Sequence, residues 1–154
     1  MALRQSEQPF AVFVLGIVLM RIRIIITWLI LAGAVWAEDY AVVVAQDSPI
    51  SFGDSVKIRE IFLKKRSFDS QTRVIPINLI GNERVRIEFE TQVLQMNREQ
   101  INRYWITNHF QGVSPPATQA SLPSVKRFIQ SVPGAIGYLP KEMVDDDLKI
   151  IYEF

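Results

Sequence analysis

The chain has no cysteine and a single histidine among its 154 residues. The absence of thiols excludes disulfides, thiolate metal sites and cysteine nucleophiles. His109 has no second histidine to complete a metal pair and no Ser-His-Asp order around it, so we predict a surface or helix-end residue beside Phe110. The formal net charge is only +1, which implies no nucleic acid partner. No catalytic constellation is present, and we expect neither an enzyme nor a cofactor.

The remaining polar and aromatic clusters have plain structural interpretations. Asp145–Asp147 is a consecutive run, whereas calcium loops place their acids at alternating positions, so an exposed turn is predicted and no metal site. Lys64–Arg66 is too short for a nucleic-acid footprint. Arg84 and Arg86 are predicted to be solvated helix charges, with anion binding as the alternative. Three aromatic residues recur at helical spacing and are predicted to belong to the core: Tyr104, Trp105 and Phe110.

The first 37 residues have the layout of a secretory signal peptide. Arg21 and Arg23 form a positive region, Ile24–Leu31 is almost purely apolar, and small residues follow up to Ala37. Cleavage after Ala37 is predicted, with a second possible site at 32–34, and translation can also begin at Met20. The predicted product is a periplasmic domain of residues 38–154, and the membrane is involved only through the signal segment.

The alternative interpretation is a retained membrane anchor. Residues 10–20 and 24–36 together are long enough to span a bilayer. However, Arg21 and Arg23 interrupt this stretch, and a charge at the bilayer centre costs roughly 2.5–3.5 kcal/mol on insertion scales. The cleaved signal peptide is therefore favoured over the anchor.

The remaining chain alternates strand and helix patterns. Strands are predicted at 40–45, 74–78, 135–139 and 148–154, and helices at 55–64, 83–95, 97–107 and 121–132. Side chains predicted to cap the helices are Asp54 or Ser55, Asn97, and Ser121 or Ser124. Because Pro76 cannot donate to a ladder, its strand is placed at an edge or begins there. The alternation predicts one α/β domain with a mainly parallel sheet flanked by helices.

Val132–Tyr138, with the sequence VPGAIGY, is the most informative stretch. Its proline and glycines predict a helix stop followed directly by a buried strand. The block resembles a signature of the phosphate ABC transporter substrate-binding proteins of the PstS type. Ile58–Lys65 resembles the helix and turn of that family, and Val74–Ile77 resembles the strand that leads to its phosphate loop. The resemblance covers nearly all of residues 40–154 and implies one lobe of a type 2 periplasmic binding protein-like fold.

The anion loop departs from the pattern that this resemblance implies. In the family, an Arg and a Ser-Gly-Thr run hold phosphate through a guanidinium, hydroxyls and helix amides. Aligned without gaps, the Arg falls on Leu79 and the run falls on Glu83–Val85, so the guanidinium and both hydroxyls are lost. A carboxylate at Glu83 also repels phosphate, although it has a structural role as an acid at a helix N-terminus. The degenerate loop that remains is Asn78, Gly81, Asn82, Glu83 and Arg84.

Two functional hypotheses follow. The first is a non-enzymatic, solute-binding-protein-like domain that recognises a small anion with this loop and with the loop near Asp47–Ser48, phosphate being doubtful. A single lobe cannot enclose a ligand, so a dimer or partner would have to supply the other wall. The second is an interaction module whose cleft face meets a periplasmic protein, such as a sensor or transport component. The lost anion ligands favour this second hypothesis, and the span of the resemblance favours the first.

Overall fold

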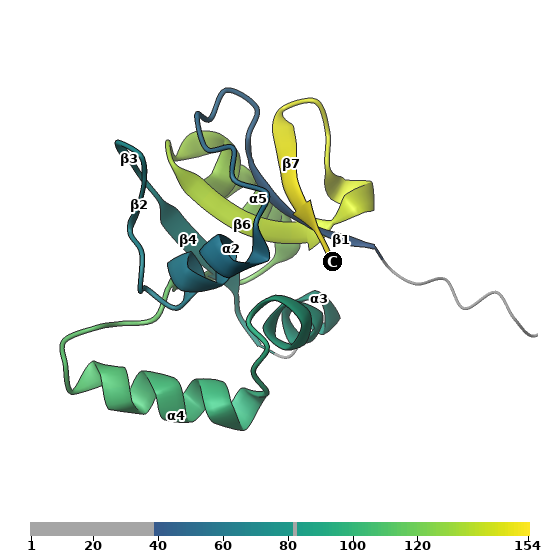
Figure 1. Ribbon diagram of the computed structural model, residues 1–154. Helices are drawn as coiled ribbons and strands as arrows, with labels where there is room; N and C mark the ends of the chain where they lie inside the picture. The colour runs from purple at the N-terminus through teal and green to yellow at the C-terminus, as the bar shows by residue number, and fades with distance from the viewer. Residues whose placement is uncertain (1–38, 82) are drawn as a thin grey trace, which may run out of the picture. The chain divides into compact units, whose positions relative to one another are not determined.

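The computed structural model describes residues 39–81 and 83–154, so the predicted signal segment and Asn82 lie outside the described residues. Five strands form a sheet in the order β5-β4-β6-β1-β7 (Figure 1). They are β1 (Tyr40–Ala45), β4 (Ile75–Leu79), β5 (Ala117–Gln119), β6 (Ala135–Pro140) and β7 (Leu148–Glu153). A small antiparallel hairpin stands apart, made of β2 (Phe68–Asp69) and β3 (Thr72–Arg73).

The sheet is mixed, with four strands in one direction and one reversed. β4 pairs in parallel with both β5 and β6, whereas β1 is antiparallel to β6 and to β7. The prediction of a mainly parallel α/β sheet is thus confirmed for the strand directions, with β1 as the exception. β1 is buried along its length, as predicted for a continuous apolar run in an inner strand. Because β1 is reversed, its last residue Ala45 and the last residue of β4, Leu79, lie at opposite ends of the strands. This separation matters for the candidate site.

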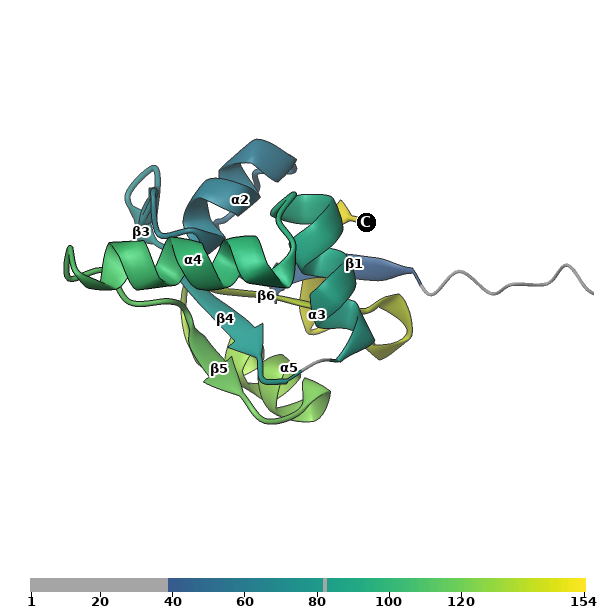
Figure 2. The ribbon, with the colours of Figure 1, turned by 90° about the horizontal axis from the view of Figure 1, so that it is seen from below.

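Helices cover both faces of the sheet. They are α2 (Ser55–Phe62), α3 (Arg84–Glu88), the π-helical segment η1 (Phe89–Val93), α4 (Arg98–His109), α5 (Leu122–Ser131) and the short 3₁₀ helix η2 (Lys141–Met143). α5 packs on β6, β1 and β4 from one side, and α2 and α3 lie on the other (Figures 1 and 2). α4 lies on the same side as α2 and α3 (Figure 2). None of the helices in the described ranges has the length and apolar character of a membrane span.

The predicted helix starts are confirmed by their capping bonds. Asp54 Oδ1 accepts from the Val56 amide at 2.9 Å, and Ser121 Oγ accepts from the Ser124 amide at 3.4 Å. Asn97 and Gln100 form a reciprocal capping box with distances of 2.9 and 2.8 Å. Such caps satisfy amides that have no partner within the helix. These local signals position α2, α4 and α5 along the chain.

The stretch Val132–Tyr138 folds as predicted, because α5 ends at Ser131 and β6 begins at Ala135. Gly134 has a φ of +79°, and a Cβ there would lie 2.2 Å from the Arg73 carbonyl oxygen. A Cβ at Gly137 would lie 2.8 Å from Ile129 Cδ1, so this glycine lets α5 pack closely on the sheet. The two glycines thus serve two different close approaches.

The core on the α2–α3 side of the sheet is a cluster of aromatic rings. The Phe89 ring stacks on Tyr138 with a centroid distance of 4.2 Å and lies 4.6 Å from Phe62. Phe154 adds an edge contact to Phe89 at 5.6 Å. All described members of the hydrophobic core belong to residues 40–148, with further apolar side chains up to Phe154 packed against them. The described residues from Asp39 to Phe154 therefore carry their own core and belong to one compact unit.

Three sequence predictions need correction. β4 is an inner strand, so an edge position for Pro76 was wrong. Its alternative place near the strand start was right, because β5 pairs with β4 only from Ile77 onward. β5 and the β2–β3 hairpin lie in segments predicted to be connections. Phe110, predicted to be core, is 86% exposed, because no described element covers the end of α4.

Candidate functional site

The predicted anion loop lies at the carboxyl end of β4 and in the turn to α3. Gly81 has a φ of +85°, a left-handed conformation that favours glycine. Glu83 occupies the N-cap position of α3 without making a side-chain capping bond, and both Glu83 and Arg84 are exposed. The turn thus carries a carboxylate and a guanidinium on two consecutive exposed residues.

Asn78 is engaged with the sheet. Its Oδ1 accepts from the Tyr138 hydroxyl at 3.3 Å, and the same hydroxyl accepts from the Leu79 amide at 3.3 Å. Burial raises the pKa of Tyr138 to about 12. Tyr138 therefore stays protonated at neutral pH and keeps donating to Asn78. The side-chain oxygen Oδ1 of Asn78 thereby joins β4 to β6 through the Tyr138 hydroxyl.

Arg86 brings a guanidinium to the end of β4 from the first turns of α3. Its Nη1 donates to the Leu79 carbonyl, and its Nε donates to Glu90 Oε1 at 2.9 Å. Glu90 is only 5% exposed, and its Oε2 lies 3.1 Å from Arg98 Nη2 in a second ion pair. A buried carboxylate held by two guanidinium groups is a structural arrangement, because an unpaired charge there would be strongly destabilising.

The sequence interpretation of Arg86 as a solvated charge, or alternatively as an anion ligand, is corrected by this network. Arg86 is largely buried, with 15% of its side chain exposed, and its partners are Leu79 and Glu90. The spacing of four residues between Arg86 and Glu90 was visible in the sequence. The burial of Glu90 was not, since it depends on packing between η1 and the sheet.

Asp47 and Ser48 are not brought to the anion loop. They follow β1. Because β1 runs in the opposite direction to β4, the carboxyl end of β1 lies at the other end of the strands from Leu79. Ser48 is held there by three bonds: its amide donates to the Ala45 carbonyl at 3.0 Å, its Oγ accepts from the Ile50 amide at 3.3 Å, and its carbonyl accepts from Lys149 Nζ at 2.8 Å. Asp47 lines a hollow of about 260 Å³ next to Gly134. The predicted grouping of these two loops was therefore wrong.

Other polar candidates occupy the surface. His109 is exposed at the end of α4 and contacts the Phe110 ring, as predicted. In the acidic run, Asp145 pairs with Lys126 at 2.6 Å, which lowers the pKa of the Asp145 carboxyl. Within the described ranges, no group of three or more acidic or histidine side chains is arranged to hold a metal.

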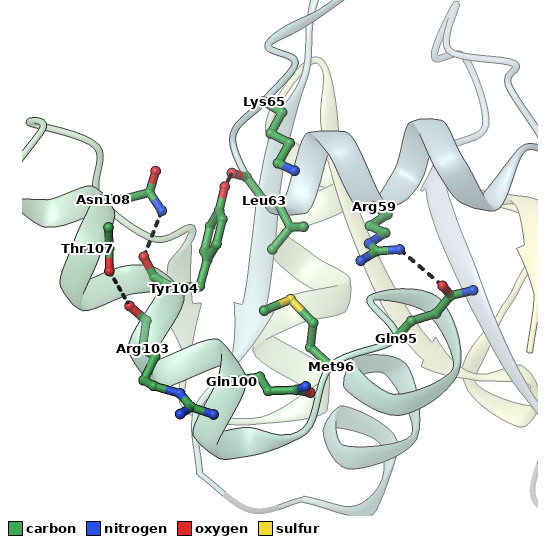
Figure 3. A pocket seen from close by; sticks show the side chains of 10 residues that line it. All are labelled: Arg59, Leu63, Lys65, Gln95, Met96, Gln100, Arg103, Tyr104, Thr107 and Asn108. Carbon is green, nitrogen blue, oxygen red and sulfur yellow. Dashed lines mark hydrogen bonds between the residues drawn. The ribbon is translucent and has the colours of Figure 1, made fainter.

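A different set of residues forms a groove that sequence reasoning missed. It has a volume of about 600 Å³ and lies between the end of α2 and α4 (Figure 3). Tyr104, predicted to be core, is only half-buried and lines this groove. Helical spacing placed Tyr104 on one face of α4 but could not show whether another element covers that face.

The mixed sheet with mostly parallel strands and flanking helices is consistent with one lobe of a type 2 periplasmic binding protein-like fold, as the similarity to two solved structures supports. The chain is similar in structure to a protein from Clostridium perfringens assigned as a phosphate ABC transporter substrate-binding protein and solved with bound phosphate. The TM-score is 0.59 at 16% identity, over 72% of this chain and 43% of that chain. It is also similar to an ABC-type phosphate transport receptor from Vibrio cholerae. Here the TM-score is 0.57 at 17% identity, over 73% of this chain and 45% of that chain.

These similarities confirm, at the level of the fold, the relationship predicted from the sequence. The chain spans less than half of the length of the solved structures that it matches. No protein-family model and no curated protein sequence matches it.

Proposed function

We propose that this chain is an exported, non-enzymatic binding domain of the solute-binding-protein type whose β4–α3 turn does not hold phosphate. The observation that carries the proposal is the engagement of Arg86 with the Leu79 carbonyl and Glu90. After Arg84, Arg86 is the next arginine along the chain from the end of β4, and its Nη1 and Nε already donate within the fold. The turn is thus a degenerate version of an anion site.

The balance of groups at the turn supports this proposal. The backbone amides at the start of α3 and the exposed Arg84 favour an anion there. Glu83 opposes it, since two like charges at ~4 Å repel by up to about 4 kcal/mol at an effective dielectric of 20, and by less in exposed positions. No serine or threonine lies between Gly81 and Val85, and the Asn78 carbonyl oxygen already has a donor. Tight binding of a phosphate dianion is therefore unfavourable.

Export is the second part of the proposal and rests on the sequence. Arg21 and Arg23, the apolar run Ile24–Leu31 and the small residues up to Ala37 support a signal peptide that is cleaved after Ala37. Expression of the full chain with a C-terminal tag in a Gram-negative host tests it. We expect a periplasmic product with the mass of residues 38–154 plus the tag. A membrane-bound product that keeps residues 21–37 would support the anchor instead.

Phosphate binding is tested by thermal unfolding of residues 38–154 with and without 10 mM phosphate, with sulfate at equal ionic strength as the control. A site with a dissociation constant of about 100 μM would stabilise the fold by about 2.7 kcal/mol at ~10 mM phosphate, which raises the Tm by several degrees. We expect no difference between phosphate and sulfate. A stabilisation specific to phosphate would overturn the proposed loss of the site.

The second candidate function, a module that binds a periplasmic protein, is favoured by one observation. The α2–α4 groove is lined by basic, apolar and neutral polar side chains, with no acidic one, and does not include the anion loop. The sequence interpretation assigned the cleft face to a partner protein. The groove offers a second surface for such a partner. A sensor or transport component remains the kind of partner that the fold suggests.

A further inference from the structure

The α2–α4 groove lies away from the anion loop along the chain. It includes Gln95 and Met96, which follow η1, whereas the anion loop precedes α3. The helical run from Arg84 to Val93 separates the two, and ten helical residues extend about 15 Å. A ligand in the groove therefore contacts a different set of side chains from a ligand at the turn.

The groove is basic. Arg59 reaches it from α2, Lys65 from the turn after α2, and Arg103 from α4, while none of its lining residues is acidic (Figure 3). Two acids neighbour these residues in the sequence. Glu60 pairs with Arg66 at 3.0 Å, and Glu99 lies 3.6 Å from Arg103 and offsets part of its charge, while Arg59 and Lys65 have no acidic partner among the ion pairs of the described residues. The groove is left with an excess of positive charge.

Two hydrogen bonds fix the shape of the groove by joining its walls. Arg59 Nη1 donates to Gln95 Oε1 at 3.1 Å, which ties α2 to the end of η1. The Tyr104 hydroxyl donates to the Leu63 carbonyl at 2.8 Å, which ties α4 to the end of α2. Both bonds are drawn in Figure 3. The groove is thus largely pre-formed, which lowers the entropy cost of binding.

Apolar side chains line the groove, and others are exposed on α2 and at the end of α4. Leu63, Met96 and Tyr104 are among the lining residues. Val56 is exposed on α2, one turn before Arg59, and Phe110 is 86% exposed, seven residues after Arg103. Residues three, four or seven apart share a helix face, so each exposed apolar side chain lies in line with an arginine of the groove. The pattern is a basic centre with apolar flanks.

From this arrangement we propose that the α2–α4 groove binds an acidic peptide segment of a partner protein, with apolar residues on either side of its carboxylates. The guanidinium groups of Arg59 and Arg103 suit carboxylates, which accept well-directed bonds from them. A peptide fits better than a small acid, because Arg103 has 69% of its side chain exposed and small-ligand sites usually bury 70–90% of the ligand. The inference is independent of whether the β4–α3 turn binds an anion.

The test measures binding of a fluorescein-labelled twelve-residue peptide, with glutamates interspersed among leucines, to residues 38–154 by fluorescence anisotropy at low salt. We expect saturable binding that weakens as salt is added. A peptide with glutamine at each glutamate position should bind at least fivefold more weakly. The double variant Arg59→Gln/Arg103→Gln should lose about four- to twenty-five-fold in affinity, if each exposed pair contributes about two- to fivefold.

Two further variants separate the groove from general effects of charge. Arg127→Gln removes an exposed charge from α5, on the other side of the sheet, and should bind the peptide within twofold of the unchanged protein. Phe110→Ser removes an exposed ring and should weaken peptide binding severalfold without lowering the Tm. Unfolding curves of all variants confirm that each one is folded.

Several outcomes would overturn the proposal. Equal peptide affinity of the unchanged protein and the double variant would exclude the groove. Displacement of the peptide by millimolar glutarate, with no effect of Phe110→Ser, would assign the groove to a small carboxylate. Concentration-dependent self-association that is lost in Asp146→Asn/Asp147→Asn would assign it to a second copy of this chain. Phosphate that stabilises the fold without displacing the peptide would overturn only the proposed function of the turn.

Discussion

The Tyr138 hydroxyl donates to Asn78 Oδ1 at 3.3 Å and thereby joins β6 to the carboxyl end of β4, where the anion loop begins. The same hydroxyl accepts from the Leu79 amide, so one side chain satisfies groups from two successive residues. Because Tyr138 is buried against Phe62 and Phe89, its protonation state is linked to the stability of the whole fold.

We predict that Tyr138 makes the protein less stable at alkaline pH. Burial raises its pKa to about 12, against 10.0 for a free tyrosine. Between these values the unfolded tyrosine loses its proton and the folded one keeps it, so the free energy of unfolding falls as the pH rises. Two pKa units correspond to about 2.7 kcal/mol, fully present below about pH 10 and lost by about pH 12.

The measurement compares urea unfolding of the unchanged protein and of Tyr138→Phe between pH 8 and pH 12. At pH 8 the variant should be less stable by about 1–3 kcal/mol, since Leu79 and Asn78 lose a hydrogen-bond partner. The comparison cancels the titration of the lysines, which both proteins share. A stability difference that does not shrink above pH 10 would contradict the burial of this hydroxyl.

Gly137→Ala is predicted to destabilise the fold by about 1–3 kcal/mol through overpacking. The new Cβ would lie 2.8 Å from Ile129 Cδ1 and 3.0 Å from Ile77 Cγ2, both in the core. Gly134→Ala should cost more, because its Cβ would meet the Arg73 carbonyl at 2.2 Å in a left-handed conformation. Gly112→Ala is the matched control for φ alone, since it has a φ of +79° with open space around it. Calorimetry should rank Gly134→Ala as the most destabilising of the three.

The predictions from sequence succeeded where the signals are local. The caps Asp54 and Asn97 and the strand after Gly134 depend on neighbouring residues, and the structure has them where expected. β5 was missed because its three residues are held by pairing with β4, about forty positions earlier in the chain, rather than by their own pattern.

The candidate site was predictable only in part, for a related reason. The gapless comparison with the family pattern predicted which anion ligands are missing from the β4–α3 turn, because that is a question of residue identity. Whether Arg86 is free to bind an anion depends on its distance from Leu79 and Glu90, which only the folded chain determines. The groove beside Tyr104 was invisible for the same reason, since helical spacing does not indicate what covers a face.

Lys64→Gly is predicted to stabilise the protein by about 1 kcal/mol. Lys64 follows α2 with a φ of 58°, a left-handed conformation in which glycine is unstrained. Its removal also relieves the repulsion from Arg73 that helps to lower the Lys64 pKa. Lys65→Gly serves as the control, because Lys65 does not have a positive φ and should gain no stability. Thermal unfolding at pH 7 would contradict this account if Lys64→Gly lowered the Tm.

The pairing of Arg86 with Glu90 gives the prediction that most directly tests the proposed function. Arg86→Ala should destabilise the fold by roughly 2–4 kcal/mol, because Arg98 is then the one ion-pair partner left to the buried Glu90 among the described residues, and the Leu79 carbonyl loses a donor. In a double-mutant cycle with Glu90→Ala, the two effects should be non-additive by about 1 kcal/mol or more. Arg127→Ala, which removes an exposed charge from α5, should change stability by less than about 0.5 kcal/mol.

The same variant separates a structural from a ligand-binding role of Arg86. If its guanidinium serves only the fold, phosphate should stabilise neither the unchanged protein nor Arg86→Ala beyond the effect of sulfate. If Arg86 instead turned outward to bind an anion, phosphate would stabilise the unchanged protein and the variant would lose that response. To do so, Arg86 would have to release both Leu79 and Glu90. The free energy lost when the buried Glu90 gives up this partner would oppose the free energy gained from binding the anion. We therefore expect the phosphate response to be absent from both proteins.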